Sequence, residues 1–167
     1  MKKFFYLHFK EDDGGGVAYS SSKDVGKDTE GAVKFAISRT VIQDYQANDD
    51  GLPLMSCNLK SVIESSVNLI ISWKSFWIEN GDLKRYEYFS PIFSSNVYII
   101  CREKSKVANG PIGEVIIKAC LSEKKIGELE FFPLSNSSIR LIVSERLKAK
   151  IEESNLTGME FSAVPVG

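Results

Sequence analysis

Histidine and cysteine are scarce in this 167-residue sequence, and their scarcity limits the chemistry that the chain can perform. His8 is the one histidine, so a Ser-His-Asp or Cys-His catalytic site would have to be built around it. Cys57, Cys101 and Cys120 lie too far apart in the sequence for a paired-cysteine zinc knuckle. We therefore expect no metal site, no cofactor and no catalytic residues, and we interpret His8 as a half-exposed residue of a strand.

Long apolar runs and an excess of positive charge are also lacking. The longest apolar runs, such as 67–71 and 97–101, fall far below the roughly 20 residues that span a bilayer. The N-terminal apolar stretch is short and runs into acidic residues without a cleavage site, which predicts a first β-strand rather than a signal peptide. The 21 basic and 22 acidic residues nearly cancel, which disfavours a nucleic-acid-binding protein. These features, with an odd number of dispersed cysteines, predict a cytoplasmic protein without a membrane or nucleic-acid partner.

Phosphate-binding loops and paired carboxylates give no firm sign of an enzyme. Two glycine-containing stretches, 14–16 and 26–28, lack the further residues that a dinucleotide-binding or Walker loop needs. Acidic pairs lie among Gly, Asn and Ser residues, where solvated turns are the usual structure. An acid/base pair also needs a cleft that shifts one pKa, and no sequence pattern shows such a cleft. A carboxylate-based enzyme therefore stays an open alternative without positive support.

Alternation of apolar and polar side chains dominates the chain and is typical of β-strands. It predicts strands at 5–9, 33–38, 67–73, 86–93, 97–102, 115–120 and 139–143, with turns at 80–82, 94–96 and 109–111. Residues 10–31 form a long acidic loop in this interpretation, interrupted by a short strand at 17–19. We predict one α+β domain over residues 1–167, mainly a mixed or antiparallel sheet, with two short helices at 57–65 and 145–154.

The C-terminal part of the chain predicts a strand–helix–strand unit. Ser144 follows an apolar strand and can cap a helix by accepting a hydrogen bond from a free first-turn N–H group. Glu145 lies near the positive end of the helix dipole, and Leu147 and Ile151 form one apolar stripe. Residues 159–163 then alternate again as a strand. The unit therefore contains a capped helix that docks by its Leu/Ile stripe.

An earlier segment matches this unit. Residues 52–66 align with residues 140–154 at a constant offset, so that residue 52 corresponds to residue 140. The identical pairs are Ser56/Ser144, Leu59/Leu147, Lys60/Lys148, Ile63/Ile151, Glu64/Glu152 and Ser66/Ser154. The match favours a duplicated strand–helix–strand unit, with an internal repeat at 52–78 and 140–165. Convergence of two short amphipathic helices is the alternative.

The tail of the chain, residues 127–164, resembles the C-terminus of bacterial polymorphic-toxin immunity proteins of the immunity protein 11 and 43 groups. The resemblance rests on an apolar strand, the run Ser-Glu-Arg-Leu at 144–147, a helix, the run Leu-Thr-Gly at 156–158 and a Phe-containing strand. It implies a cytoplasmic, non-enzymatic antitoxin. Such a protein would form a one-to-one complex with a cognate toxin domain, such as a nuclease, and would block its activity by occlusion.

Two kinds of side chain are candidates for the toxin interface. Aromatic residues gather between residues 73 and 98, and an end-of-strand position near the surface is predicted for its two tryptophans. Acidic loops could imitate the phosphates that a basic nuclease groove binds. The partner-binding residues that we expect are Asp12, Asp13, Asp49, Asp50, Trp73 and Trp77. Core packing of the aromatic residues, plain solvated loops and a non-catalytic scaffold domain that assembles with itself remain alternatives.

Overall fold

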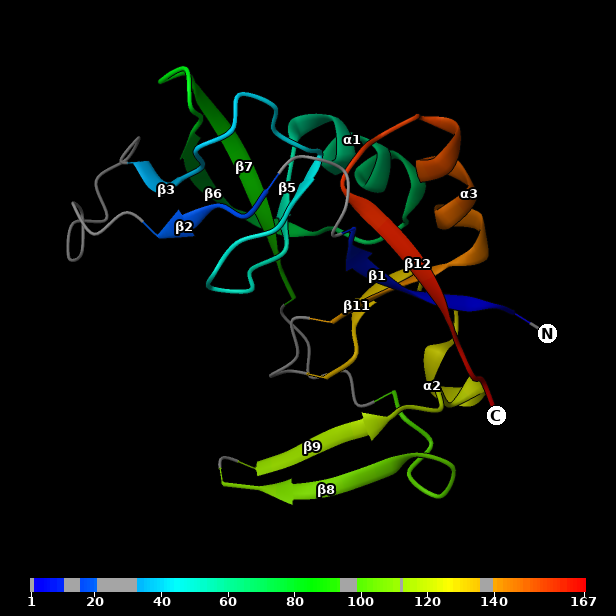
Figure 1. The fold of residues 1–167 in the computed structure, drawn as a ribbon. Helices are drawn as coiled ribbons and strands as arrows, with labels where there is room; N and C mark the ends of the chain where they lie inside the picture. The colour runs from blue at the N-terminus through cyan, green and yellow to red at the C-terminus, as the bar shows by residue number, and fades with distance from the viewer. Residues whose placement is uncertain (1, 11–15, 21–32, 94–98, 112, 136–139) are drawn as a thin grey trace.

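The computed structural model describes residues 2–10, 16–20, 33–93, 99–111, 113–135 and 140–167, and its path is shown in Figure 1. The strands are β1 (Phe4–Phe9), β2 (Tyr19–Ser20), β3 (Val33–Ala36), β4 (Tyr45–Gln46), β5 (Leu54–Met55), β6 (Ser72–Glu79), β7 (Arg85–Ile92), β8 (Lys106–Gly110), β9 (Gly113–Lys118), β10 (Phe131–Pro133), β11 (Leu141–Ser144) and β12 (Met159–Val164). The helices are α1 (Cys57–Ser66), α2 (Glu123–Ile126) and α3 (Glu145–Glu153). This composition confirms the predicted α+β fold.

One antiparallel sheet is built around the N-terminal strand, and we call it the β1 sheet. Its strand order is β10-β11-β1-β12, so the first strand lies between two of the last. Alternation along β1 sends Phe5, Leu7 and Phe9 to the face covered by α1 and α3, while Phe4 and Tyr6 face the opposite side. The two helices lie side by side above the sheet in Figure 1. The β1 sheet therefore separates two apolar cores.

A second sheet is mixed and closes on itself, and we call it the closed sheet. Its order is β2-β3-β6-β7-β5-β4, with β3 parallel to β6. The edges meet where Ala18 pairs with Asn48, because the Ala18 N–H donates to Ala47 at 2.9 Å and the Asp49 N–H donates to Ala18 at 3.1 Å. Buried side chains that include Phe35, Phe76 and Tyr88 fill its interior. Its pairing is thus mixed, which agrees with the predicted mixed or antiparallel sheet.

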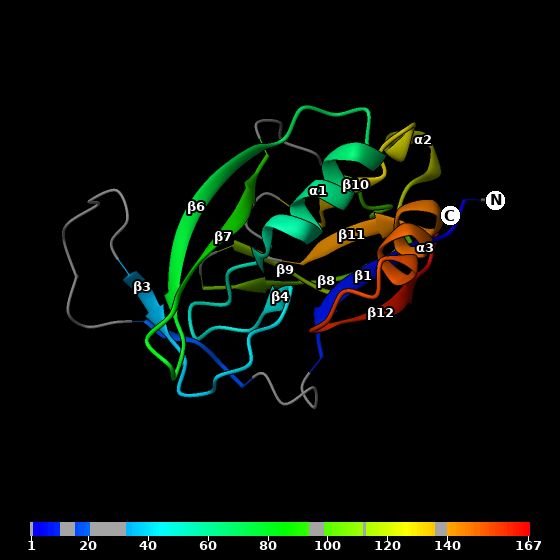
Figure 2. The same ribbon diagram turned by 90° about the horizontal axis from the view of Figure 1, so that it is seen from above.

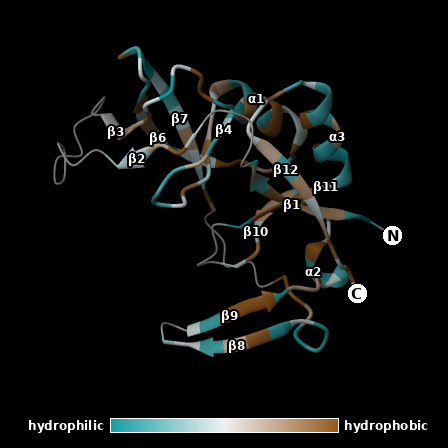
Figure 3. Ribbon diagram, in the orientation of Figure 1, coloured by the Kyte–Doolittle hydropathy of each residue, from teal (hydrophilic) through white to brown (hydrophobic). Residues whose placement is uncertain are grey.

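The β8–β9 hairpin and α2 pack under the β1 sheet. Ile116 of β9 and Ile126 of α2 contribute to the core that also contains Phe4. The apolar colouring of β9 in Figure 3 extends beyond this core, because Val115 and Ile117 on the opposite face of the strand are exposed. No helix in the described part of the chain has the length and apolar character needed to cross a membrane.

The two long helices begin and dock in the same way, as the sequence predicts. The Ser56 and Ser144 hydroxyls accept hydrogen bonds from the N–H groups three residues later, at 3.2 and 3.1 Å. The paired Leu and Ile side chains of both helices are at most 1% exposed and share one core. Arg146 of α3 also donates to the Ser66 carbonyl at the end of α1, so the helices are joined by hydrogen bonding as well as by packing.

The strands around each helix have equivalent registers. β5 and β6 flank the antiparallel strand β7, whereas β11 and β12 flank the antiparallel strand β1. The offset that aligns the two helices also aligns these flanking strands residue for residue. In one unit, Phe89 of β7 lies opposite Met55 and Ser75. In the other, Phe5 of β1 lies opposite the equivalent residues, Val143 and Ala163.

An equivalent lysine lies over two aromatic rings in each unit. The Lys60 Nζ atom lies 5.8 Å from the Trp73 ring centroid and 4.9 Å from that of Phe89. In the second unit, Lys148 Nζ lies 5.2 Å from the Phe5 ring centroid and 5.4 Å from that of Phe161. Each lysine also pairs with a glutamate four residues later. The stems of these lysines therefore cover aromatic side chains on the helix-facing side of each sheet.

Several predicted boundaries need correction. The strand predicted at 67–73 is wrong, because Val67 ends α1, the following apolar residues form a loop and the strand begins at Ser72. Within the described part of 97–102, Ile100 forms an isolated bridge and Arg102 lies in a turn, so a strand there is also wrong. At the predicted turn 109–111, the first two residues belong to β8. The predicted turn at 94–96 lies outside the described residues.

The two caps generate a stability prediction. Ser144→Ala should lower the free energy of unfolding by about 1 kcal/mol, because one helix N–H group loses its acceptor. Ser56→Ala should cost more, since the Ser56 hydroxyl also donates to Asp44 at 2.6 Å. Leu147→Ala should cost about 2–5 kcal/mol through the cavity it leaves. Urea denaturation of the three variants measures these differences, and equal stability of wild type and Leu147→Ala would contradict the docked helix.

Candidate functional site

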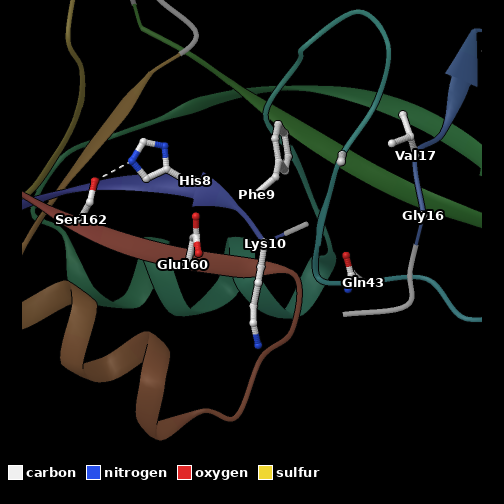
Figure 4. Close-up of a pocket in the computed structure, with 9 residues that line it drawn as sticks. His8, Phe9, Lys10, Gly16, Val17, Gln43, Glu160 and Ser162 are labelled. Carbon is white, nitrogen blue, oxygen red and sulfur yellow. Dashed lines mark hydrogen bonds between the residues drawn. The ribbon is translucent and has the colours of Figure 1, made fainter. Parts of the chain in front are cut away.

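A cleft of about 710 Å³ opens between the β1 sheet and the closed sheet. The β1–β12 pair contributes His8, Glu160 and Ser162 to its lining, and the closed sheet with its adjoining loops contributes Val17, Gln43 and Ala47 (Figure 4). Its two walls therefore come from segments that are distant in the sequence. The cleft joins polar groups to a small apolar surface, which is the usual character of a binding site.

His8 lies in β1 and is half-buried, as the sequence predicts. Its Nε2 atom lies 2.7 Å from the Ser162 hydroxyl oxygen, and its ring centroid is 5.5 Å from that of Tyr6 on the same face. Burial raises the pKa of Tyr6, and the neighbouring Arg140 opposes this shift. Among the described residues no carboxylate is hydrogen-bonded to the His8 ring, although Glu160 is its register partner. In the described part of the chain, the Ser–His pair therefore has no hydrogen-bonded acid of the kind that orients a catalytic imidazole.

The closed end of the cleft is held by the turn that precedes β12. The Tyr45 N–H donates to the Thr157 carbonyl at 3.1 Å, and the Lys10 N–H donates to the Gly158 carbonyl at 3.1 Å. The Asp44 carboxylate accepts from the Thr157 N–H at 3.0 Å and from the Thr157 hydroxyl at 3.2 Å. One short turn therefore fixes both walls of the cleft at this end.

Gln43 lines the same end and contributes an unusual polar group. Its side chain is only 5% exposed, and its Nε2 atom has no hydrogen-bond partner within the described residues. Its carbonyl accepts a hydrogen bond of 2.5 Å from the buried Tyr88 hydroxyl. Burial raises the pKa of Tyr88, and the charges of Asp44 and Tyr86 act in the same direction, so this hydroxyl remains a donor at neutral pH. The backbone at Gln43 is thus anchored while its amide lacks an acceptor.

The structure places part of the predicted acidic set beside the cleft. Asp49 and Asp50 are exposed in the turn that follows β4, close in sequence to Ala47 of the cleft lining. Asp49 Oδ1 accepts from the Ser20 N–H at 2.9 Å, and the Ser20 hydroxyl lies 3.1 Å from Asp50 Oδ1. Both carboxylates therefore also hold the edge of the closed sheet.

Two of the predicted acidic residues cannot be placed. Asp12 and Asp13 lie outside the described residues. The residues that flank the 11–15 segment, Lys10 and Gly16, both line the cleft.

The two tryptophans lie elsewhere, in β6, where Trp73 is near the start of the strand as predicted and Trp77 lies within it. Trp73 is the second residue of β6, and Trp77 lies inside the same strand opposite Glu87. Trp73 packs against the helix core beneath Lys60, and its Nε1 atom is buried without a partner among the described residues. Trp77 is half-buried, and neither tryptophan lines the cleft.

Sequence reasoning missed Gln43, Glu160 and Ser162 as cleft residues. Gln43 stands in a short connection without periodicity, so nothing in the sequence distinguishes it. The alternation of 159–163 does place Glu160 and Ser162 on one face of a strand, but it cannot show that His8 lies on the same face. The described residues contain no group of three or more His, Cys, Asp or Glu side chains arranged to hold a metal ion.

Gly158 supplies a test of how the closed end is built. Its φ angle is +86°, and a Cβ atom there would lie 2.4 Å from the Tyr45 carbonyl oxygen and 2.6 Å from Gln43 Cβ. Gly127 also has a positive φ angle, +54°, but a Cβ there would meet nothing within 4 Å.

Gly158→Ala should therefore destabilise the fold by about 1–3 kcal/mol more than the matched control Gly127→Ala, because only Gly158 combines strain with a backbone clash. Thermal unfolding of the two variants measures the difference. Equal losses would show that the two walls do not meet as closely as described.

The family of the protein follows from its sequence as a whole. No curated protein sequence matches the chain. The family described as immunity protein family (Imm11) matches residues 10–166, a range that contains every helix and strand except β1 and every described residue of the cleft except His8 and Phe9. The tail resemblance is thereby confirmed over almost the full chain. The protein belongs to the Imm11 immunity protein family.

Proposed function

We propose that this protein is an antitoxin that binds one cognate bacterial toxin domain in the cytoplasm and blocks its activity through a one-to-one complex. The observation that carries the proposal is the family match over residues 10–166, since an immunity protein family implies a toxin partner. Neutralisation by occlusion requires a binding surface and no chemistry of its own. The cleft and the acidic turn beside it supply such a surface.

The charges beside the cleft favour a toxin with a basic surface. Asp49 and Asp50 present two exposed carboxylates, and the sequence carries Asp12 and Asp13 between the cleft residues Lys10 and Gly16, outside the described residues. A nuclease groove that binds phosphates carries the complementary charge. Charge complementarity of this kind mainly accelerates association.

The tryptophans of β6 supply the aromatic part of the proposed interface. Trp77 is half-buried on the outer face of the closed sheet, where its ring can bury further against a partner. Trp73 lies on the same face, four residues earlier, beneath Lys60. Desolvated aromatic anchors slow dissociation more than they change association. We therefore assign Trp77 the role of anchor and Trp73 that of a second aromatic contact on the same face.

Co-expression tests the proposed function directly. We expect this chain to restore growth of cells that express the toxin domain encoded in the neighbouring gene, and to co-purify with it in equal amounts. A toxin that is neither bound nor made less toxic by this chain would contradict the antitoxin function. The self-assembling scaffold alternative would then be the remaining interpretation.

Charge reversal tests the acidic part of the interface. Asp12→Lys combined with Asp13→Lys should slow association with the toxin and weaken its dependence on salt, because attraction at long range is lost. The matched control reverses Asp82 and Glu123, two exposed acidic residues outside the cleft lining. Trp77→Ala should instead increase the dissociation rate. Stopped-flow or surface-plasmon measurements separate the two rates, and equal effects of both double variants would contradict steering by the acidic loops.

A further inference from the structure

Within the part of the chain that the structure describes, the strand β12 has an edge with no paired strand. It is the outermost strand of the β1 sheet, as Figure 2 shows, and it pairs with β1 alone. The Lys10 N–H donates to the Gly158 carbonyl, which fixes the alternation of the antiparallel ladder. Backbone groups of Glu160, Ser162 and Val164 therefore point toward β1. Those of the alternate residues, Met159, Phe161 and Ala163, point outward.

These outward groups are open to pairing. Among the described residues, the outward N–H and C=O groups of β12 make no backbone hydrogen bond. The strand carries no proline or lysine, which are common devices against edge pairing. Its Glu160, Ser162 and Ala163 side chains are exposed. The outward groups extend from Met159 to Ala163, since the Pro165 carbonyl beyond them already accepts from the Leu121 N–H at 2.8 Å. The edge can therefore accept a short additional strand.

The cleft begins where this edge becomes free. At Thr157 the outward carbonyl is already occupied, because it accepts from the Tyr45 N–H of β4. One residue further along, Gly158 still touches Gln43. Beyond it, the two sheets diverge, with Glu160 and Ser162 on one wall of the cleft and Val17 on the other. Tyr45 of β4 thus makes one backbone hydrogen bond with the turn before β12, and no further backbone bond joins β4 to β12 among the described residues.

The closed end of the same cleft holds a buried donor. Gln43 Nε2 has no acceptor among the described residues, and leaving such a group unpaired in the interior is costly. A peptide main chain supplies a carbonyl oxygen that this donor can bind. It also supplies alternating N–H and C=O groups that can pair with the edge of β12. The edge and the amide therefore point to the same class of ligand.

We propose that an extended segment of the toxin adds to the free edge of β12 as a fifth strand of the β1 sheet. This inference rests on the proposed antitoxin function and specifies how the partner is bound. Main-chain hydrogen bonds to Met159, Phe161 and Ala163 hold the segment, while Gln43 Nε2 donates to a carbonyl at its closed end. Strand addition of this kind derives affinity from the backbone and specificity from the side chains along the cleft.

Amide hydrogen exchange, measured by NMR on the free protein and on its complex with a catalytically inactive toxin domain, tests the proposal residue by residue. Exchange at Met159, Phe161 and Ala163 should slow at least roughly tenfold on binding, which corresponds to about 1.4 kcal/mol. Glu160, Ser162 and Val164 should be protected in both states. A complex that leaves the first three amides unprotected would overturn strand addition alone, whereas failure to form any complex would overturn the antitoxin function as well.

Variants of the edge provide a second measurement. Ala163→Pro removes one outward N–H without removing a bond to β1, and Ala163→Ser is the control that keeps this N–H. The proline variant should bind the toxin at least roughly tenfold more weakly than the serine variant. Equal affinities would overturn the proposal. If the proline variant fails to fold, the exchange pattern of the wild type decides alone.

Gln43→Leu separates a binding role from a structural one. Removal of the unpaired amide should leave the free protein at least as stable, yet weaken toxin binding severalfold. Unchanged affinity would exclude Gln43 from the interface. Size-exclusion chromatography of the free chain supplies the remaining check, because a dimer paired through β12 would assign this edge to a second copy and overturn its assignment to the toxin.

Discussion

The Asp44 carboxylate connects the parts of this protein that would otherwise be independent. One oxygen accepts from the Ser56 hydroxyl that caps α1, and the other accepts from both the N–H and the hydroxyl of Thr157 before β12. The closed sheet, the first long helix and the edge strand of the β1 sheet therefore meet at one side chain. The Leu-Thr-Gly run at 156–158 has a physical reason here, because Thr157 binds Asp44 and Gly158 leaves room for Tyr45 and Gln43.

Local patterns were predicted well because their causes are local. A serine before an apolar stripe predicts a capped helix wherever it occurs, and the offset between the two matching segments predicts two such helices. We propose that these units arose by internal duplication, which the equivalent lysine–aromatic contacts of Lys60 and Lys148 support. Alignment of the two repeated segments could not reveal that β7 and β1 take equivalent central positions. In the chain, β7 follows its strand–helix–strand unit, whereas β1 precedes its own.

The candidate site was predicted only in part, because some of its features depend on contacts between distant segments. Asp49 and Asp50 stood out through their charge, whereas Gln43 matters through burial and a missing partner, which no local pattern encodes. The strand predicted at 67–73 failed because apolar composition does not specify burial: Ile70 lies in a loop and is 96% exposed. A cleft whose walls come from both ends of the chain becomes visible only when the two sheets are placed together.

The position of β1 between β11 and β12 also governs when the fold can form. During synthesis this strand is made well before β11 and β12, the two strands that pair with it. Long-range pairing of this kind slows folding, because a large loop must close before any hydrogen bond is gained. The closed sheet consists of β2 to β7, which follow one another along the chain, so it can assemble while the remainder is translated. Loss of β12 would leave β1 without a neighbour on one side, so the β1 sheet is complete only after this late strand has been made.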